Sequence, residues 1–166
     1  MGFHTFASRA TVSAVIVSFL FVSKIGFGSD WLQYRGPESA GITTERIITA
    51  PSELWRMTVG SGMSSMISCG GRVYVIGHVR GGAGRGVNTL YCLDSATGAV
   101  IWKYAYDCRS VQGGFGSTPL DPAGPRATPA TDGVSVYSVS LEGHLFCHNA
   151  LTGDVVWYRS IPGRLG

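Results

Sequence analysis

The alternation of apolar and polar residues predicts two β-hairpins of the same pattern. In residues 90–103 an apolar run leads into a polar turn closed by Thr-Gly, and a second apolar run carries Trp102 near its end. The same order returns without a gap in residues 145–158, where the second run carries Trp157. Short apolar runs on either side of a Gly-containing turn are typical of β-hairpins. The chain therefore uses one β unit twice.

Each hairpin completes a unit of four short strands. Strand candidates at 64–68 and 72–77 precede the first hairpin, and candidates at 127–131 and 134–139 precede the second. One further strand, which begins with the same Trp pattern at Trp55, is predicted at 54–60. Four-stranded units that recur about every 50 residues are the sequence signature of β-propeller blades. The predicted fold is therefore all-β, a β-propeller of four-stranded antiparallel blades, present as an incomplete ring of about two blades and one N-terminal closing strand.

The rest of the chain divides into a leader, an extended segment and a connector. Residues 1–28 have the apolar run and the small residues of a signal peptide, so we expect cleavage after Gly28 and export to the periplasm or the cell exterior. The run is shorter than the ~20 residues of a membrane-spanning helix, so no stable span is expected after cleavage, although Lys24 leaves an uncleaved anchor as the alternative. The other expected parts are an extended segment at 29–53, a closing strand at 54–60, blade one at 64–106, a connector at 107–126 and blade two at 127–161.

Charge and cysteine usage narrow the function classes. The net charge is +3 and charged residues make up 14% of the chain, with the basic residues scattered, so nucleic-acid binding gains no support. Cys92 and Cys147 occupy the same strand position in the two repeats and are expected to be packed side chains. A pairing of Cys69 with Cys108 stays open, because their separation in space cannot be read from the sequence.

The residues that define the repeat are expected to have structural roles. Side chains of Asp94 and Asn149 are suited to accept backbone N–H groups two or three residues further on, and Gly98 and Gly153 are suited to the positive φ of the turn. The tryptophan that follows is expected to wedge against the neighbouring blade, with Trp102 placed between the two blades. The repeat residues are Asp94, Thr97, Gly98 and Trp102 in the first copy and Asn149, Thr152, Gly153 and Trp157 in the second.

The pattern Leu-Tyr-x-Leu-Asp-x-x-Thr-Gly-x-x-x-Trp resembles the pyrroloquinoline-quinone (PQQ) type β-propeller repeat of quinoprotein alcohol dehydrogenases and of the BamB outer-membrane assembly scaffold. The segment from Asp30 to Pro37, together with Gly124 to Pro129, resembles secreted PQQ-like propeller proteins of planctomycete-type bacteria. Asn149 departs from the family's usual Asp. The resemblance implies a ring of seven or eight blades, so the chain is expected to be a fragment, with open blade edges that favour self-association.

Three kinds of chemical site are not expected. A PQQ dehydrogenase needs a calcium cage and adjacent cysteines, which this chain does not show, so no cofactor and no catalytic residue is predicted. The glycine-rich stretch at 81–86 leads into a strand rather than a helix, which favours a connector over a phosphate loop. His144 and His148 lie four residues apart in a strand, a spacing of about 13 Å that cannot serve one metal ion.

The function most consistent with these patterns is a non-catalytic exported scaffold that holds a protein partner or an extracytoplasmic ligand. Arg126, at the end of the connector, and Trp31 and Tyr34, in the extended segment, are the candidate contact residues. The alternatives are a fragment of a PQQ-dependent quinoprotein dehydrogenase and a carbohydrate-binding module that uses Trp31.

Overall fold

Two four-stranded antiparallel sheets make up the folded body. The structure is a computed structural model that describes residues 28–46, 50–109 and 124–161. Each sheet is a meander, in which every strand pairs with the next one along the chain. The first sheet contains β1 (Ile67–Cys69), β2 (Arg72–Arg80), β3 (Arg85–Asp94) and β4 (Val100–Arg109). The second contains β5 (Ala130–Thr131), β6 (Ser135–Val139), β7 (His144–Asn149) and β8 (Val155–Ser160).

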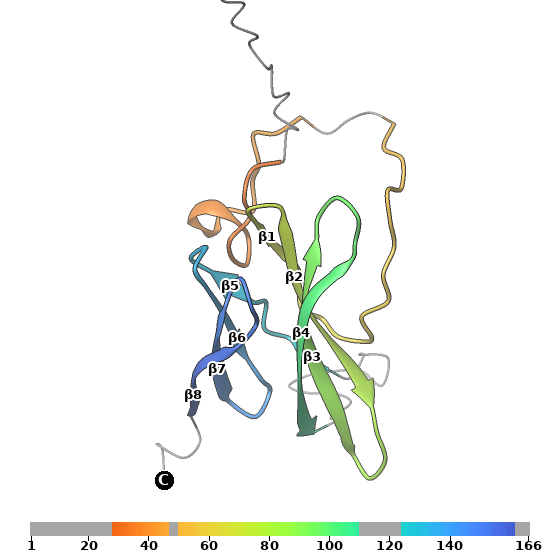
Figure 1. Cartoon of the computed structure of the whole chain (residues 1–166), viewed down its shortest axis with the longest axis vertical. Helices are drawn as coiled ribbons and strands as arrows, with labels where there is room; N and C mark the ends of the chain where they lie inside the picture. The colour runs from red at the N-terminus through yellow and green to blue at the C-terminus, as the bar shows by residue number, and fades with distance from the viewer. Residues whose placement is uncertain (1–27, 47–49, 110–123, 162–166) are drawn as a thin grey trace, which may run out of the picture.

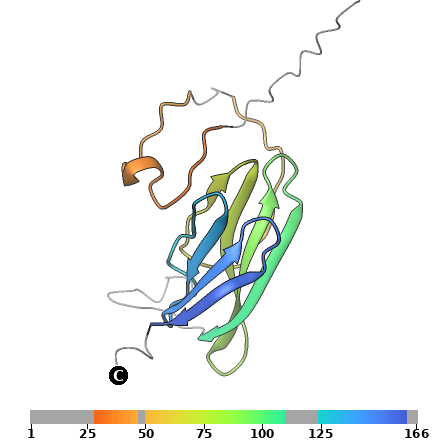
Figure 2. The same cartoon turned by 60° about the vertical axis from the view of Figure 1, so that its left-hand side comes forward.

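The two sheets are consecutive blades of a β-propeller, as the repeat predicted. They stand side by side and face each other (Figures 1 and 2), and their facing side chains form one core. That core joins apolar residues from both sheets, because a single blade is too thin to bury its own face. Its members are Ile67, Tyr74, Ile76, Leu90, Cys92 and Trp102 from the first blade and Val136 and Ala150 from the second.

The turn of each hairpin is closed by its own side chains. The Asp94 carboxylate accepts the backbone N–H groups of Ala96 at 3.1 Å and Thr97 at 2.8 Å. The Asn149 side chain makes the same pair of contacts in the second blade, to residues 151 and 152. Gly98 has a φ of 71° and Gly153 a φ of 81°, and a β-bulge precedes each turn. The two copies therefore fold alike in detail.

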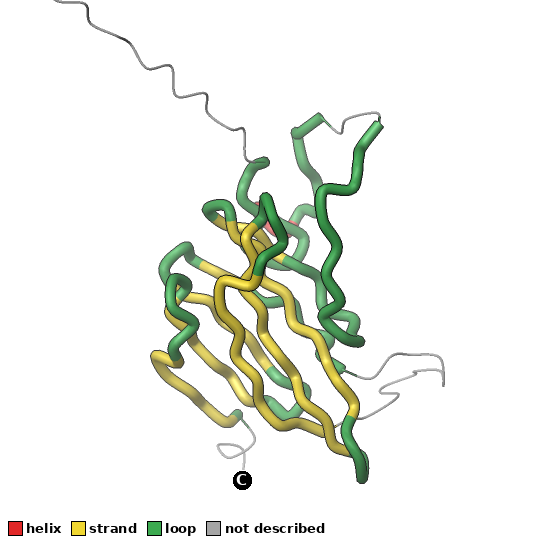
Figure 3. The backbone as a smooth tube through the Cα atoms, turned by 45° about the vertical axis from the view of Figure 1, so that its right-hand side comes forward, coloured by secondary structure: helices red, strands yellow, loops and turns green. Residues whose placement is uncertain are grey.

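The structure differs from the prediction at residues 54–60, which form no strand. Figure 3 shows residues 50–66 running along the edge of the first sheet as a strap, and their ladder contact is one bridge between Ser61 and His78. The backbone of Val59 passes so close to Gly77 that a Cβ there would come within 1.6 Å of the Val59 carbonyl oxygen. A β-strand needs a hydrogen-bonded neighbouring strand along its length. Among the described residues, the strap has such a ladder partner only at the bridge between Ser61 and His78.

Element boundaries also shift slightly. The strand predicted at 64–68 is observed as β1, three residues later at its start, and β4 continues to Arg109, so the first three residues of the expected connector belong to blade one. The hairpin between β2 and β3 turns through Ala83 and Gly84, both with positive φ, so the glycine-rich stretch joins two strands. The expected signal peptide, apart from Gly28, and connector residues 110–123 lie outside the described residues.

The N-terminal segment lies as extended chain on the inner strands of both blades. Trp31 exchanges two backbone hydrogen bonds with Ser68 of β1, at 2.8 and 3.0 Å. The carbonyl of the next residue, Leu32, accepts the backbone N–H of Thr131 in β5 at 2.9 Å. A short 3-10 turn, η1 (Pro37–Ser39), follows. The segment therefore connects the two blades, which matches its expected placement on the folded body.

All four cysteines are free thiols. Cys92 and Cys147 are buried in the blades, and Cys108 is buried beside the His78 ring, with 3.6 Å between its sulfur and Nδ1. Cys69 lies near the Asp30 carboxylate instead, so the pairing with Cys108 that the sequence left open is not made.

Candidate functional site

Three side chains of the first blade converge on one carbonyl oxygen of the second blade, that of Ala150 in its hairpin turn. The indole N–H of Trp102 donates to it at 3.0 Å, the Arg72 guanidinium at 2.8 Å and the Tyr74 hydroxyl at 3.4 Å. Arg72 also donates to the carbonyl of Leu151 at 3.3 Å. Trp102 is 8% exposed, and its ring lies on Gly153. Three donors on one buried acceptor fix the position of blade two relative to blade one.

The same contact occurs one blade earlier. The indole N–H of Trp55 in the strap donates to the carbonyl of Ser95 at 2.9 Å, and its ring lies on Gly98. Trp55 therefore occupies the docking position of a preceding blade, although its segment forms no strand. Sequence comparison of the three Trp segments indicated their similarity, and the structure places Trp55 and Trp102 in equivalent contacts.

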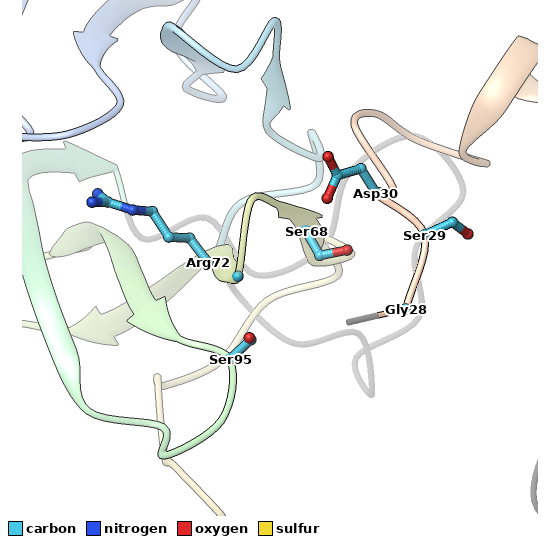
Figure 4. Close-up of a pocket in the computed structure, with 7 residues that line it drawn as sticks. Gly28, Ser29, Asp30, Ser68, Arg72 and Ser95 are labelled. Atoms are coloured by element: carbon cyan, nitrogen blue, oxygen red, sulfur yellow. The ribbon is translucent and has the colours of Figure 1, made fainter. Parts of the chain in front are cut away.

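A polar hollow of about 180 Å³ lies beside this junction, at the inner strand of blade one (Figure 4). The extended segment, β1 and the first hairpin turn meet there. It is lined by Gly28, Ser29, Asp30, Ser68, Gly71, Arg72 and Ser95. The sequence did not single out these residues, because they come from three distant segments and share no spacing.

Both charged side chains of the polar hollow are engaged in structural contacts. The Asp30 carboxylate accepts the backbone N–H of Gly70 at 2.9 Å and lies 3.7 Å from the Cys69 sulfur. Burial raises the pKa of the Cys69 thiol, and the nearby Asp30 charge raises it further, so this thiol stays protonated at neutral pH. Figure 4 shows the Arg72 side chain extending away from Asp30, toward the second blade. The hollow therefore offers hydroxyl groups and one carboxylate for hydrogen bonding.

A wider groove of about 370 Å³ lies between the outer strands of the two blades. Aromatic residues from β4 form one side and aromatic residues from β7 and β8 the other. The lining residues are Tyr104, Tyr106, Asp107, His144, Phe146, Val155 and Tyr158. We call this feature the aromatic groove. The aromatic residues at alternate positions 102, 104 and 106 are the sequence signal that was missed, since alternate residues of a strand share one face.

The three predicted contact residues do not come together in either cavity. Arg126 is exposed at the start of blade two, where the neighbouring Pro125 carbonyl accepts the backbone N–H of Met63 at 2.9 Å. Tyr34 is 62% exposed, whereas Trp31 is half-buried, with its ring against Gly36. The Trp31 ring is therefore used in packing the N-terminal segment.

His144 and His148 belong to the aromatic layer between the blades. The His148 ring is fully buried, 4.7 Å from the Tyr104 ring centre, and its Nδ1 lies 3.1 Å from the Gly153 carbonyl oxygen. His144 packs edge-on against Tyr158 at 5.7 Å. Within the part of the chain that the structure describes, no group of three or more His, Cys, Asp or Glu side chains is placed to hold a metal ion. Nor does any helix among these residues have the length and apolar character to cross a membrane.

The family comparison decides what the two blades belong to. Residues 46–163 match the model of a PQQ-repeat family described as "Outer membrane protein assembly factor BamB". The chain belongs to this BamB-type family. A search of curated proteins finds no match.

Solved structures with similar folds are longer proteins. A europium-containing methanol dehydrogenase is 20% identical, with a TM-score of 0.44, over 64% of this chain and 17% of its own. Quinohemoprotein alcohol dehydrogenase from Comamonas testosteroni is 19% identical, with a TM-score of 0.42, over 61% and 13%. BamB from Moraxella catarrhalis is 19% identical, with a TM-score of 0.32, over 61% and 35%. The chain thus spans about a third or less of each.

The repeat of the BamB-type family is named after a quinone cofactor, and the described residues do not fit one. A PQQ group held by calcium needs several converging oxygen ligands. The polar hollow provides a single carboxylate, which already accepts hydrogen bonds, and at about 180 Å³ it is smaller than the 300–1,000 Å³ typical of ligand pockets.

Proposed function

We propose that this chain is part of an exported, non-catalytic β-propeller scaffold that binds a partner protein outside the cytoplasm. The family to which the chain belongs is described as an outer membrane protein assembly factor, which supports a role in protein assembly. The export and the absence of catalysis belong to the proposal.

The observation that carries the proposal is the pairing of the N-terminal segment with β1. Trp31 and Ser68 exchange both backbone hydrogen bonds, and Leu32 is bound to Thr131 in the next blade. The inner strands of both blades therefore bind an extended chain through backbone groups. Addition of an extended segment to a strand edge is a general mode of peptide recognition. We infer that a partner is held at the same inner end of the blades.

The polar hollow fits this role because it lies where the bound segment crosses β1. Ser68 presents its hydroxyl group on the side of Asp30 and Ser95 on the side of Arg72 (Figure 4), and both charged side chains are already held by structural contacts. Such a surface is suited to hydrogen bonding with a polypeptide. Exposed Arg126, at the start of blade two, is the second position proposed to contact the partner.

Site-specific photo-crosslinking tests the proposal. The photoreactive p-benzoylphenylalanine replaces Ser95 or Arg126 in the chain expressed in its source cells, and Val156, which is 60% exposed on the outer strand β8, serves as the control position. We expect one protein to crosslink from Ser95 and Arg126 but not from Val156, and the purified pair to bind. Absence of a shared crosslinked protein contradicts the scaffold. So does dye-linked alcohol oxidation that depends on added PQQ and calcium.

A further inference from the structure

We propose that residues 30–32 are a displaceable occupant of the partner site, and that the partner places an extended acidic segment of its own on β1 and β5 in their stead. This inference rests on the proposed scaffold function and names the kind of segment that the scaffold binds. The chain's own N-terminal segment shows which chemistry the inner strands accept, because it is itself an extended chain bound there.

The inner strands hold this segment mainly through backbone groups. Trp31 exchanges two backbone hydrogen bonds with Ser68 of β1, and the carbonyl of Leu32 accepts the backbone N–H of Thr131 in β5. Any residue other than proline can supply the N–H of such a pair, and every residue can supply the carbonyl. A different polypeptide in extended conformation can therefore make the same three hydrogen bonds.

One side chain of the segment adds a preference for an acidic residue. The Asp30 carboxylate accepts the backbone N–H of Gly70 at 2.9 Å. Gly70 lies in the two-residue turn between β1 and β2, next to the last ladder pair, Cys69 with Arg72, so its N–H is outside the β-ladder. A hydrogen bond to a carboxylate is stronger than one to a neutral acceptor. The site therefore favours a segment with an acidic residue directly before the residue that pairs with Ser68.

The apolar side chains of the resident segment add little to its attachment. The ring of Trp31 is only half-buried and packs on Gly36 of its own segment. Leu32 is 37% exposed and Tyr34 is 62% exposed. Among the described residues, the core shared by the two blades takes no member from residues 28–46. Parts of a protein with few buried apolar contacts open most readily, so the segment can leave while the blades stay folded.

The next part of the segment holds itself together. The backbone N–H of Gly36 donates to the carbonyl of Gln33 at 2.9 Å, and that of Gly41 donates to the carbonyl of Arg35 at 2.7 Å. These hydrogen bonds join residues within the segment and do not involve the blades. Residues 33–41 can therefore move away as one loop, and an incoming segment competes with the contacts of residues 30–32.

Fluorescence anisotropy with a fluorescein-labelled peptide tests the inference on the full chain. The peptide has the sequence of residues 29–34, Ser-Asp-Trp-Leu-Gln-Tyr, with both ends blocked. Trp31→Pro in the chain removes the N–H that donates to Ser68 and frees the site, so we expect it to bind the peptide at least about tenfold more tightly than the parent does. Ile42→Pro is the control, because this residue is 72% exposed and lies beyond the bound residues; we expect it to bind as the parent does.

Equal peptide affinity of the parent and Trp31→Pro overturns the inference, as does the lack of saturable binding to a folded Trp31→Pro chain. If circular dichroism shows that Trp31→Pro is unfolded, Asp30→Ala replaces it. That variant loses the carboxylate contact to Gly70, so we expect about threefold tighter peptide binding than in the parent, and parental affinity overturns the inference.

A second peptide tests the acidic preference. Asn replaces Asp in it, and we expect about threefold to tenfold weaker binding to the variant with the freed site. Equal binding of the two peptides overturns the acidic preference. Crosslinking from Ser95 and Arg126 separates this inference from the scaffold function. A retained crosslink without peptide binding overturns only the inference, whereas loss of the shared crosslink overturns the scaffold.

Discussion

The indole ring of Trp102 lies directly on Gly153 of the neighbouring blade: a Cβ built on Gly153 would come within 2.6 Å of the ring. Trp55 and Gly98 are related in the same way, also at 2.6 Å. The glycine of the Thr-Gly turn therefore has two roles. It adopts the positive φ that closes its own hairpin, and it leaves room for the tryptophan of the preceding unit.

Replacement of Gly153 by alanine is expected to weaken the docking of the blades. The substitution meets both a φ of 81° and the Trp102 ring, so we expect a loss of about 2–4 kcal/mol in the free energy of unfolding by urea. Gly70→Ala is the matched control, since Gly70 has a φ of 56° but no atom within 4 Å of a built Cβ. Its expected loss is about 1 kcal/mol. Equal losses would show that ring contact at Gly153 adds nothing.

The two repeat tryptophans are expected to differ in their effect on stability. Trp102 is 8% exposed and bonded to the Ala150 carbonyl, so Trp102→Ala is expected to lower the free energy of unfolding by about 3–5 kcal/mol. Trp157 is only half-buried, and its ring centre lies 6.1 Å from that of Tyr137 in its own blade. Trp157→Ala is therefore expected to lower the free energy of unfolding by less. Thermal melts of both variants measure the difference. A Trp102 variant that melts like the parent would contradict the docking role.

Arg72 is expected to stabilise the blade junction together with Trp102, with which it shares the Ala150 carbonyl. Arg72→Ala removes the guanidinium contacts to the carbonyls of Ala150 and Leu151, and a loss of about 1.5–3 kcal/mol is expected for hydrogen bonds of a charged donor. Arg56→Ala is the control, because Arg56 forms an exposed ion pair with Glu53 that contributes about 0–1 kcal/mol. Equal urea midpoints for the two variants would argue against the junction.

Stability is expected to fall as the pH drops below about 6.5 because of His148. Burial lowers the pKa of this ring, and Nε2 has no hydrogen-bond partner among the described residues. In this pH range the unfolded chain binds a proton at His148 that the folded chain does not bind. The free energy of unfolding therefore becomes smaller as the pH falls. His148→Gln is expected to flatten this dependence between about pH 5 and 7, whereas His144→Gln is expected to retain it. An unchanged slope in His148→Gln would contradict the assignment.

The repeat made the fold predictable, and the conformation of its turns could be predicted from the turn residues themselves. Asp94 and Asn149 act on backbone groups two or three residues away, so their role is readable from local sequence. The partner of Arg72 is a backbone carbonyl 78 residues away, and a carbonyl has no residue-type signature. The polar hollow could not be predicted either, because it depends on the relative position of three segments that are distant in the sequence. Residues 54–60 of the strap have the composition of a strand, but a strand also requires a neighbour, which composition does not reveal.

The N-terminal segment also sets an order for folding. Leu32 is bonded to Thr131, about a hundred residues later in the chain, whereas every strand of each blade pairs with its immediate successor. Blade one can form its ladders as soon as residue 109 is available, but the segment reaches its final position only when β5 of blade two is in place. Contacts between distant residues form slowly because a long loop must close. We therefore expect the bond between Leu32 and Thr131 to form late, after the strands within each blade have paired.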